Sequence, residues 1–554
     1  MKRLLLFVLI LSLAVHAVYS YFPDNSTLIG GTDTASHLFK TWFIAEKGFS
    51  YWSPYWYGGF NFFSHYAPLF YLMTGSIGSF LGTLAAYKLV IDVVFILLPL
   101  AFFLLIKEFW HDERKIAIAV LIFALLPVHQ YYLYDGRHPA LLAFFFSLFY
   151  FRILIRGAQS NRNILLASLF LAFTVLSHHL VGFMALVLSL AFVKWDRKGT
   201  VALLKIVATA GLISSFWTVP FVLSSLGKPA GASLLGIDVP VTLTSQIIDA
   251  HYISNFSYPW AQYTVPVMLS VLTALSVYGL LWIRGPERRF IPFLFLMLII
   301  LVSISYNRVL IFAPLPVAIL AAEGMYKLKG LWKNALILLG ITLLLLPIMQ
   351  IPAVSYPPVP DVPQDGRVLY LPQNAFTVPY ASLYEVFLVP AHGNEYILGW
   401  HPESQTTLKL AYLSELSNPD VNPKDYAELM RRGWVNYVVV RKDYQNITFF
   451  DSPPFIKYGE DVDFEIFALR NKSTFVSLNG RDADVKVGRK DDSIFLKMEC
   501  SPGKLLIKES YDKGWTARVN DVPLPIGPDE NGFMGLDLKN SGECDITLSY
   551  TPYG

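Results

Sequence analysis

The residue with the clearest chemical potential is Asp33. It lies in a polar loop, GGTDTASH at residues 30–37, directly after the first hydrophobic segment. A carboxylate at a membrane face could take a proton in a reaction on a lipid-carried substrate. If a helix begins near residue 33, His37 shares its face with Asp33, because side chains four residues apart are neighbours on a helix. The structural alternative is that Asp33 only caps the N-terminus of that helix.

Further ionisable side chains fall at the ends of hydrophobic segments, on the side where we expect Asp33. They are His37, His65, Asp135, Arg137, His138, His178, His179, His251 and Arg308. Charged groups at membrane depth are costly and usually functional. Arg308 is the strongest candidate, because it interrupts an apolar run and its planar guanidinium matches a phosphate dianion. An arginine that extends to the membrane interface is its alternative explanation.

The other candidates also have structural explanations. The turn at residues 134–139 could be a solvated loop closed by a pair between Asp135 and Arg137. The pair His178 and His179 could form a polar hairpin turn whose imidazoles bond to backbone carbonyls. A set of aromatic residues could stack on a sugar, although a belt at the membrane interface is the commoner explanation; it comprises Trp42, Tyr51, Trp52, Tyr55, Trp56, Tyr57 and Phe60.

The composition excludes an ordinary soluble protein. Of the 554 residues, 54% are hydrophobic and 15% are charged, against roughly 25% charged in soluble domains. The net charge of +3 is small and its basic residues are dispersed, so we expect no nucleic-acid partner. No nucleotide-binding motif or zinc-protease spacing occurs; a divalent metal stays open without support. Cys500 and Cys544 are the only cysteines, which leaves one extracytoplasmic disulfide open.

The hydrophobic pattern predicts a polytopic α-helical membrane domain. Two runs, residues 163–193 and 290–322, are too long for one crossing and should fold as hairpins that break at 177–179 and 306–308. Pro68–Gly82 is rich in small polar residues and should lie along the membrane. About eleven helices then cross, near residues 4–20, 86–106, 116–131, 139–155, 164–177, 180–193, 203–224, 264–283, 290–305, 309–325 and 334–350.

Charge supports this arrangement. Most basic loop residues, including Lys2, Arg114, Arg156 and Arg288, fall on one side, which the positive-inside rule assigns to the cytoplasm. The first segment could be a cleavable signal peptide, although its apolar length favours an uncleaved helix; either way Asp33 lies outside. The glycosylation acceptor sequences also fall outside, at Asn25, Asn255, Asn446 and Asn471.

A proline-rich exit after residue 351 separates the membrane domain, residues 1–351, from an extracytoplasmic part. Strands at 367–371 and 435–440, with a helix at 425–432, indicate an α/β subdomain over 352–471. Short alternating strands, such as 493–498 and 545–550, indicate a β-sandwich subdomain over 472–554. Cys500 and Cys544 adjoin those two strands, so a bond between them is plausible.

Several short motifs together resemble the GT-C superfamily of membrane glycosyltransferases. The resemblance is strongest to its branch of 6-pyruvoyl-tetrahydropterin-synthase-related membrane proteins. The motifs are GTDTASH (31–37), WYGG (56–59), YAP (66–68), LSHH (176–179), NR (307–308), AAEG (321–324) and, C-terminally, YDKGWTARVN (511–520). The Trp-Trp-Asp-Tyr-Gly motif of oligosaccharyltransferases is missing, which argues against transfer of a whole oligosaccharide to asparagine.

The resemblance implies a multi-pass enzyme of the cell membrane that uses a polyprenyl- or dolichyl-phosphate-linked sugar as donor, with a first-loop acid as the catalytic residue. Asp33 would take the proton of an acceptor hydroxyl on a glycan, lipid or protein. Arg308, with Arg137 or His178, would stabilise the leaving lipid phosphate. No cofactor is then required. The alternative is a non-catalytic lipid-glycan transporter or assembly scaffold, although a transporter should place its charges near mid-membrane.

Overall fold

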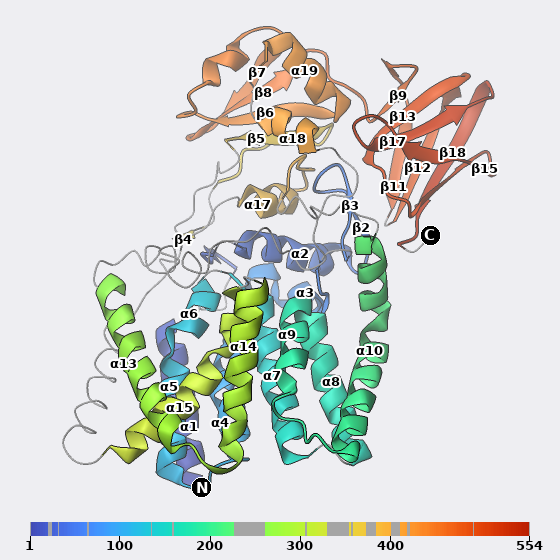
Figure 1. Ribbon diagram of the computed structural model, residues 1–554. Helices are drawn as coiled ribbons and strands as arrows, with labels where there is room; N and C mark the ends of the chain where they lie inside the picture. The colour runs from blue at the N-terminus through green and yellow to red at the C-terminus, as the bar shows by residue number, and fades with distance from the viewer. Residues whose placement is uncertain are drawn as a thin grey trace.

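The computed structural model describes residues 2–19, 25–31, 33–63, 66–134, 136–157, 160–226, 261–304, 307–328, 354–355, 358–372, 384–399, 410–417, 421–490 and 492–552. A bundle of helices carries two β-rich units at one of its ends, and the N-terminus lies at the other end (Figure 1). One hydrophobic core runs from the helices into the first β-rich unit, whereas the second unit has a core of its own. The architecture is a helical N-terminal region with several apolar helices, followed by a β-sheet region.

The bundle is built from helices of very different length. They are α1 (Lys2–Tyr19), α2 (Thr34–Lys47), α3 (Leu69–Leu81), α4 (Thr83–Ile106), α5 (Glu113–Leu125), α6 (Pro127–Tyr134), α7 (His138–Arg156), α8 (Asn161–Ser177), α9 (His179–Ser189), α10 (Arg197–Leu226), α13 (Ala261–Trp282), η1 (Gly285–Arg289), α14 (Phe290–Ile304), η2 (Asn307–Phe312) and α15 (Pro314–Lys327). Within the described residues, 4 helical stretches are long and apolar enough to cross a membrane. The expected helix at 334–350 lies outside the described residues, so the number of crossings stays a prediction.

The two predicted hairpin breaks fall where we expected them. Helix α8 ends at Ser177 and α9 begins at His179, with His178 extended between them. The second break is wider than predicted, because η2 separates α14 from α15. The single helix predicted near 116–131 is wrong: it divides into α5 and α6 at Pro127, which has no N–H to continue the helical hydrogen bonds.

Helix α3 has 13 residues, roughly 20 Å of helix, so it is too short to span a membrane core of about 30 Å. Its small residues serve close packing against α2. Thr74 shares a hydrogen bond of 2.8 Å with Thr41, and a Cβ on Gly75 would lie 2.6 Å from the side chain of Ile44. The small residues of α3 thus take part in a tight helix–helix contact, and its placement along the membrane stays a prediction.

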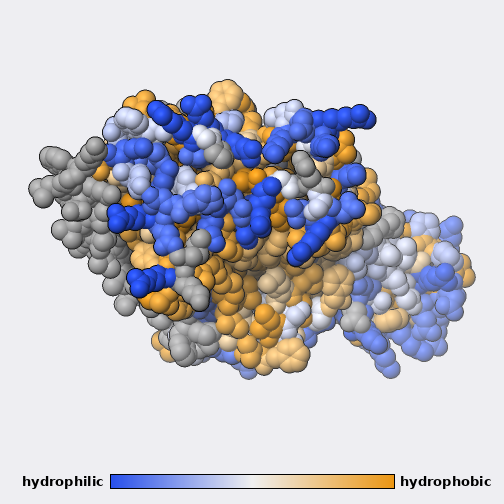
Figure 2. Space-filling model, turned by 90° about the horizontal axis from the view of Figure 1, so that it is seen from below, coloured by the Kyte–Doolittle hydropathy of each residue, from blue (hydrophilic) through white to orange (hydrophobic). Residues whose placement is uncertain are grey.

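The two ends of the bundle differ in character. Seen from the end opposite the β-rich units, the surface carries a broad hydrophilic area bordered by apolar side chains (Figure 2). Exposed basic residues lie at helix termini on this end, among them Arg114, Arg156, Arg162 and Arg197. This grouping agrees with the basic loops that the sequence places on one side.

The acceptor sequences for glycosylation are not equally available. Asn446 and Asn471 are exposed. Asn25 is also exposed, but its side-chain amide donates to the carbonyl of Leu81 at 2.8 Å and accepts from the N–H of Ala85 at 3.0 Å, where it joins α3 to α4. Asn255 lies outside the described residues.

Helices α13 and α15 approach backbone to backbone through two glycines. A Cβ on Gly279 would lie 1.9 Å from the carbonyl oxygen of Leu320, and a Cβ on Gly324 would lie 2.3 Å from that of Leu275. Small residues allow such approach between membrane helices. The AAEG motif at 321–324 therefore has a packing role.

Replacing Gly279 with alanine should lower stability by about 1–3 kcal/mol, because the methyl group meets backbone that cannot move aside. Gly211 of α10 is the matched control, since a Cβ there meets nothing within 4 Å. Gly211→Ala should stabilise the helix by up to about 1 kcal/mol. The measurement is the apparent melting temperature in detergent, and shifts of the same sign in both variants would contradict the packing role.

The first β-rich unit is an α/β sheet in the order β5-β6-β8-β7, with β5 and β6 parallel. Its elements are β5 (Arg367–Leu371), α17 (Glu385–Ala391), α18 (Leu410–Ser417), α19 (Pro423–Arg432), β6 (Val435–Arg441), η4 (Ile447–Asp451), β7 (Phe455–Glu460) and β8 (Phe464–Leu469). The strands predicted at 367 and 435 are confirmed, and so is the helix that ends at Gly433.

The second unit packs two five-stranded sheets, in the orders β10-β9-β13-β17-β16 and β11-β12-β18-β14-β15. Its strands are β9 (Val476–Leu478), β10 (Arg481–Asp482), β11 (Lys486–Lys490), β12 (Ser493–Cys500), β13 (Gly503–Ser510), β14 (Trp515–Val519), β15 (Val522–Leu524), β16 (Ile526–Pro528), β17 (Phe533–Leu538) and β18 (Gly542–Tyr550). The predicted sandwich strands are thus present. A disulfide joins Cys500 to Cys544 across β12 and β18.

A hairpin from the membrane domain connects all three parts. Its strands β2 (Trp52–Ser53) and β3 (Phe60–Asn61) lie between α2 and α3 in sequence, and a second link pairs β1 (Thr27–Leu28) with β4 (Val354–Ser355). Trp52 is part of the sandwich core, whereas Trp56 donates to the carbonyl of Val386 in α17 at 2.8 Å.

The interfacial aromatic belt is therefore a wrong interpretation for the hairpin residues. The side chains of Trp52, Trp56, Tyr57 and Phe60 are all buried. Because aromatic residues suit a protein core as well as a membrane interface, their identity did not separate the two cases.

Candidate functional site

Asp33 lies at the N-terminus of α2, at the end of the bundle that faces the β-rich units. Its side chain makes no capping hydrogen bond to the helix. Thr34 and Ser36 instead place their hydroxyls on the carbonyls of Gly30 and Asp33, at 2.8 and 3.0 Å. The capping explanation of Asp33 is thus not supported, while the helix N-terminus still favours a negative charge there.

Two glycines bring the Asp33 loop against the turn between α6 and α7. Gly31 and Gly136 both have positive φ, 118° and 81°. A Cβ on Gly136 would lie 2.7 Å from the backbone nitrogen of Thr34 and 3.1 Å from that of Asp33. Only glycine can occupy such a contact. The first polar loop and the predicted 134–139 turn are therefore in direct backbone contact.

Two histidine–tyrosine pairs lie beside this contact. Tyr71 of α3 and Nδ1 of His37 share a hydrogen bond of 2.8 Å. In α7, Nε2 of His138 donates to the carbonyl of Leu133 at 2.9 Å, which leaves Nδ1 to accept from the hydroxyl of Tyr87 at 2.6 Å. The Asp33 carboxylate interacts electrostatically with both Tyr71 and His138. Asp33, His37 and His138 therefore belong to one cluster.

Tyr66 extends the cluster to the α8–α9 turn. Its ring packs edge-on against His37 at 5.3 Å and against His178 at 5.9 Å between centroids. Nδ1 of His178 accepts from the N–H of Val181 at 3.4 Å and so caps α9. His179 instead packs on Phe221 of α10 at 4.8 Å. The structure brings His178 to the cluster and turns His179 toward α10.

Lys40 is a residue of this cluster that sequence reasoning missed. Its side chain is buried, and Nζ lies 4.4 Å from the centre of the Tyr66 ring and 5.4 Å from that of Tyr71. Lys40 follows His37 by three residues and Asp33 by seven, so helical spacing alone places the three on one face. That spacing could have identified it, whereas the roles of Tyr66, Tyr71 and Tyr87 depend on contacts between distant segments.

The structure describes only some of the remaining predicted site residues. Arg137 begins α7, and its guanidinium lies 5.6 Å from the centre of the Tyr132 ring. His65, Asp135 and His251 lie outside the described residues. The backbone of Arg308 lies in η2, which packs against α6, α7 and α9. Its side chain is not described. The segment that carries Arg308 therefore contacts the two helices on either side of Gly136 and the helix that follows His178.

The described residues contain no group of three or more His, Cys, Asp or Glu side chains that could hold a metal ion. The cluster around Asp33 combines one carboxylate, hydrogen-bonded imidazoles and a buried lysine. This set can move a proton and hold an anion.

Residues 63–236 match the family model described as the 6-pyruvoyl-tetrahydropterin synthase related domain, a membrane protein. A comparison with curated protein sequences found no match. Among solved structures, arabinofuranosyltransferase AftD from Mycobacteria is similar with a TM-score of 0.59 and 14% identity, over 100% of this chain and 57% of that one. The chain thus spans less than two thirds of the mycobacterial protein.

An Archaeoglobus fulgidus oligosaccharyltransferase, solved with zinc and sulfate, is similar with a TM-score of 0.52 and 12% identity, over 79% of this chain and 68% of that one. At these identities the likeness shows the fold. Residues 63–236 are thus similar to the 6-pyruvoyl-tetrahydropterin synthase related membrane domain, and the chain shares the fold of this arabinofuranosyltransferase and this oligosaccharyltransferase.

Proposed function

We propose that this protein is an integral-membrane glycosyltransferase. It moves a sugar from a polyprenyl- or dolichyl-phosphate donor to an acceptor hydroxyl on the extracytoplasmic face, with Asp33 as the general base. Similarity in fold to an arabinofuranosyltransferase and an oligosaccharyltransferase supports sugar transfer at a membrane. The observation that carries the proposal is the placement of Asp33, which begins a buried helix but does not cap it.

The proposed chemistry needs one base and a stabilised leaving group. The acceptor hydroxyl attacks the anomeric carbon and loses its proton to Asp33, while the bond from that carbon to the lipid phosphate breaks. His138 and Tyr71 lie beside Asp33, and their hydrogen bonds to Tyr87 and His37 hold them in place. Rigid neighbours of this kind keep a base oriented toward its substrate.

Cations would stabilise the phosphate as it leaves. We assign this role to Arg308 with Arg137 or His178, and we add Lys40, whose ammonium is buried in the same cluster. A positive charge in a water-poor site stabilises a developing anion more than it would in water. The donor would reach the cluster from the membrane lipid, whereas a glycan, lipid or protein acceptor would approach from the side of the β-rich units.

The predicted orientation can be tested with single cysteines. Asn446 of the α/β unit and Arg162 at the start of α8 are both exposed and lie toward opposite ends of the molecule. In sealed cells, Asn446→Cys should react with a membrane-impermeant maleimide, whereas Arg162→Cys should react only after permeabilisation. Because the two native cysteines are joined in a disulfide, they should contribute little background labelling by the maleimide. The reverse labelling pattern would place the Asp33 cluster in the cytoplasm and refute the proposed orientation.

A further inference from the structure

The outer face of the sheet formed by β11, β12 and β18 carries an aromatic ring that the sandwich core does not use. Phe495 is 46% exposed, whereas its neighbours in β12, Ile494 and Leu496, are buried. A groove of about 300 Å³ runs along this face and is lined by Phe495 and residues of all three strands. Val487 of β11, which also lines the groove, is 42% exposed. Two apolar side chains in a groove with a few polar groups beside them are typical of a ligand site.

Strand register arranges the groove into an apolar row and a charged row. Across the sheet, Phe495 lies opposite Gly488 on one side and Thr547 on the other. The nearest atom to a Cβ on Gly488 would be the Cβ of Phe495, at 3.8 Å. Because glycine has no side chain to cover it, one side of the ring stays open to a ligand.

The second row lies two residues further along the strands. Here Lys497 is opposite Lys486 on one side and Asp545 on the other. Lys497 also forms an ion pair with Glu543 at 2.8 Å. Positive and negative groups are thus balanced, and together they offer hydrogen-bond donors and acceptors beside the ring.

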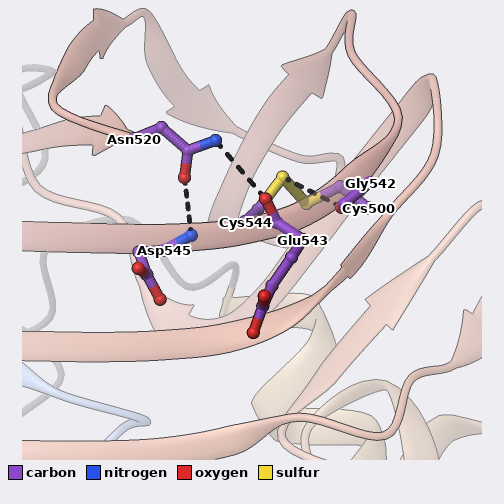
Figure 3. The surroundings of a disulfide bond; sticks show 6 residues. All are labelled: Cys500, Asn520, Gly542, Glu543, Cys544 and Asp545. Atoms are coloured by element: carbon purple, nitrogen blue, oxygen red, sulfur yellow. Dashed lines mark hydrogen bonds between the residues drawn. A yellow bond between two sulfur atoms is a disulfide. The ribbon is translucent and has the colours of Figure 1, made fainter.

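The strands that form the groove are held firmly. The disulfide between Cys500 and Cys544 joins β12 to β18 on the inner side. Asn520 lies beside the start of β18, where its Oδ1 accepts from the N–H of Asp545 at 2.8 Å. Figure 3 shows the side chains of Glu543 and Asp545 pointing away from the disulfide. The backbone that carries the two rows is therefore held in place, which lowers the entropic cost of binding.

We propose that this groove binds a neutral oligosaccharide. A sugar ring presents a face of C–H groups that can pack on Phe495, while its hydroxyls can bond to Thr547, Asp545 and Lys497. A folded protein partner needs roughly 800 Å² of surface on each side, more than a groove of nine lining residues offers. An anionic headgroup would require a net positive site, and here the carboxylates of Asp545 and Glu543 offset the two lysines.

The groove also connects to the candidate site. Asp492, in the turn between β11 and β12, accepts from the hydroxyl of Ser50 and the N–H of Trp52, both at 2.7 Å. Tyr550, which ends β18, receives a hydrogen bond of 2.7 Å from Asn61. The strands that form the groove thus hold the hairpin between α2 and α3. A bound glycan would therefore contact the strands that hold this hairpin, and the hairpin is continuous with α2 and α3, the helices next to Asp33.

The test uses the full chain in lipid nanodiscs on a glycan array, followed by titration with the oligosaccharide that binds best. Phe495→Ala should weaken binding by about tenfold or more, as for a central aromatic contact. Val462→Ala is the matched control, because Val462 is an exposed apolar residue of the α/β unit, 78% exposed. It should leave affinity unchanged. Thr547→Val, which removes one hydroxyl, should give a smaller loss.

Either of two results would overturn the proposal. One is that the wild-type chain binds no neutral oligosaccharide on the array, or binds only acidic ones. The other is that Val462→Ala weakens binding as much as Phe495→Ala does, which would indicate nonspecific adhesion. Asp33→Asn should bind the same glycan as the wild type, so a failure of the proposed catalysis and a failure of the groove are distinguishable.

Discussion

Replacing Asp33 with asparagine should reduce sugar transfer by a factor of about 10² to 10⁴, the usual contribution of a positioned base. Asparagine has nearly the same shape but cannot accept the proton of the acceptor hydroxyl. Because the two side chains are nearly isosteric, the variant should fold and melt like the wild type. The measurement is the transfer of radiolabel from a lipid-phosphate-linked sugar, together with the apparent melting temperature.

Glu46 provides the matched control for this experiment. It is an exposed carboxylate on the last turn of the same helix, far from the cluster, so Glu46→Gln should transfer sugar at the wild-type rate. If Asp33→Asn turns over within threefold of the wild type, Asp33 is not the base. Equal losses in both variants would instead point to a general effect of charge on α2.

Replacing Arg367 with methionine should destabilise the joint between the two β-rich units by about 3–5 kcal/mol, the usual cost of breaking a buried ion pair. Arg367 is fully buried, and its guanidinium lies 3.0 Å from both Glu395 and Glu509. Trp52 of the hairpin donates to Glu509 at 2.7 Å. Loss of Arg367 would therefore leave Glu395 and Glu509 to share one guanidinium, that of Arg489, at the place where the hairpin meets the sandwich.

The pH dependence of this loss is a second readout. Burial raises the pKa of Glu509, while Arg489 and Arg367 oppose that rise, so removal of Arg367 should raise the pKa further. A carboxyl group whose pKa is higher in the folded than in the unfolded state does not lower the free energy of unfolding at a pH below its unfolded pKa. As the pH rises from there toward the folded pKa, it lowers the free energy of unfolding more and more. Arg367→Met should therefore lose more stability at pH 7 than at pH 4, relative to the wild type at each pH.

A double variant supplies the control. Arg367→Met combined with Glu509→Gln keeps Arg489 paired with Glu395, so it should recover much of the stability that the single variant loses. The measurement is unfolding in denaturant, with limited proteolysis to detect release of the sandwich. A double variant that is less stable than Arg367→Met would show that the network does not act through charge balance.

Local features were predictable wherever a short run of residues decides the outcome. The break at Ser177–His179 and the helix end at Gly433 depend only on polar or flexible residues within one turn. The division at Pro127 belongs to the same class, and its missing N–H could have predicted it. Helical spacing could likewise have placed Lys40 with Asp33 and His37.

Features that depend on contacts between distant segments were not predictable. The small residues of α3 fit both a membrane interface and a close helix contact, and only the neighbouring Ile44 reveals the contact. The aromatic residues of the β2–β3 hairpin were misassigned for the same reason. The type of a residue indicates how much apolar surface it tends to bury, but it does not indicate which other part of the protein or membrane buries that surface.

From the sequence alone, the membrane-protein class, the polar breaks and the two β-rich units could be predicted, because hydrophobic period and charge are properties of neighbouring residues. The role of the Asp33 loop stays a prediction. Only the tertiary structure decided that Gly31 and Gly136 approach each other, that two histidine–tyrosine pairs lie beside Asp33, and that one hairpin is bonded to the sandwich. These contacts join residues from 34 to 489 positions apart. The segments that carry these residues come together only when the chain folds, so no local sequence pattern predicts the contacts.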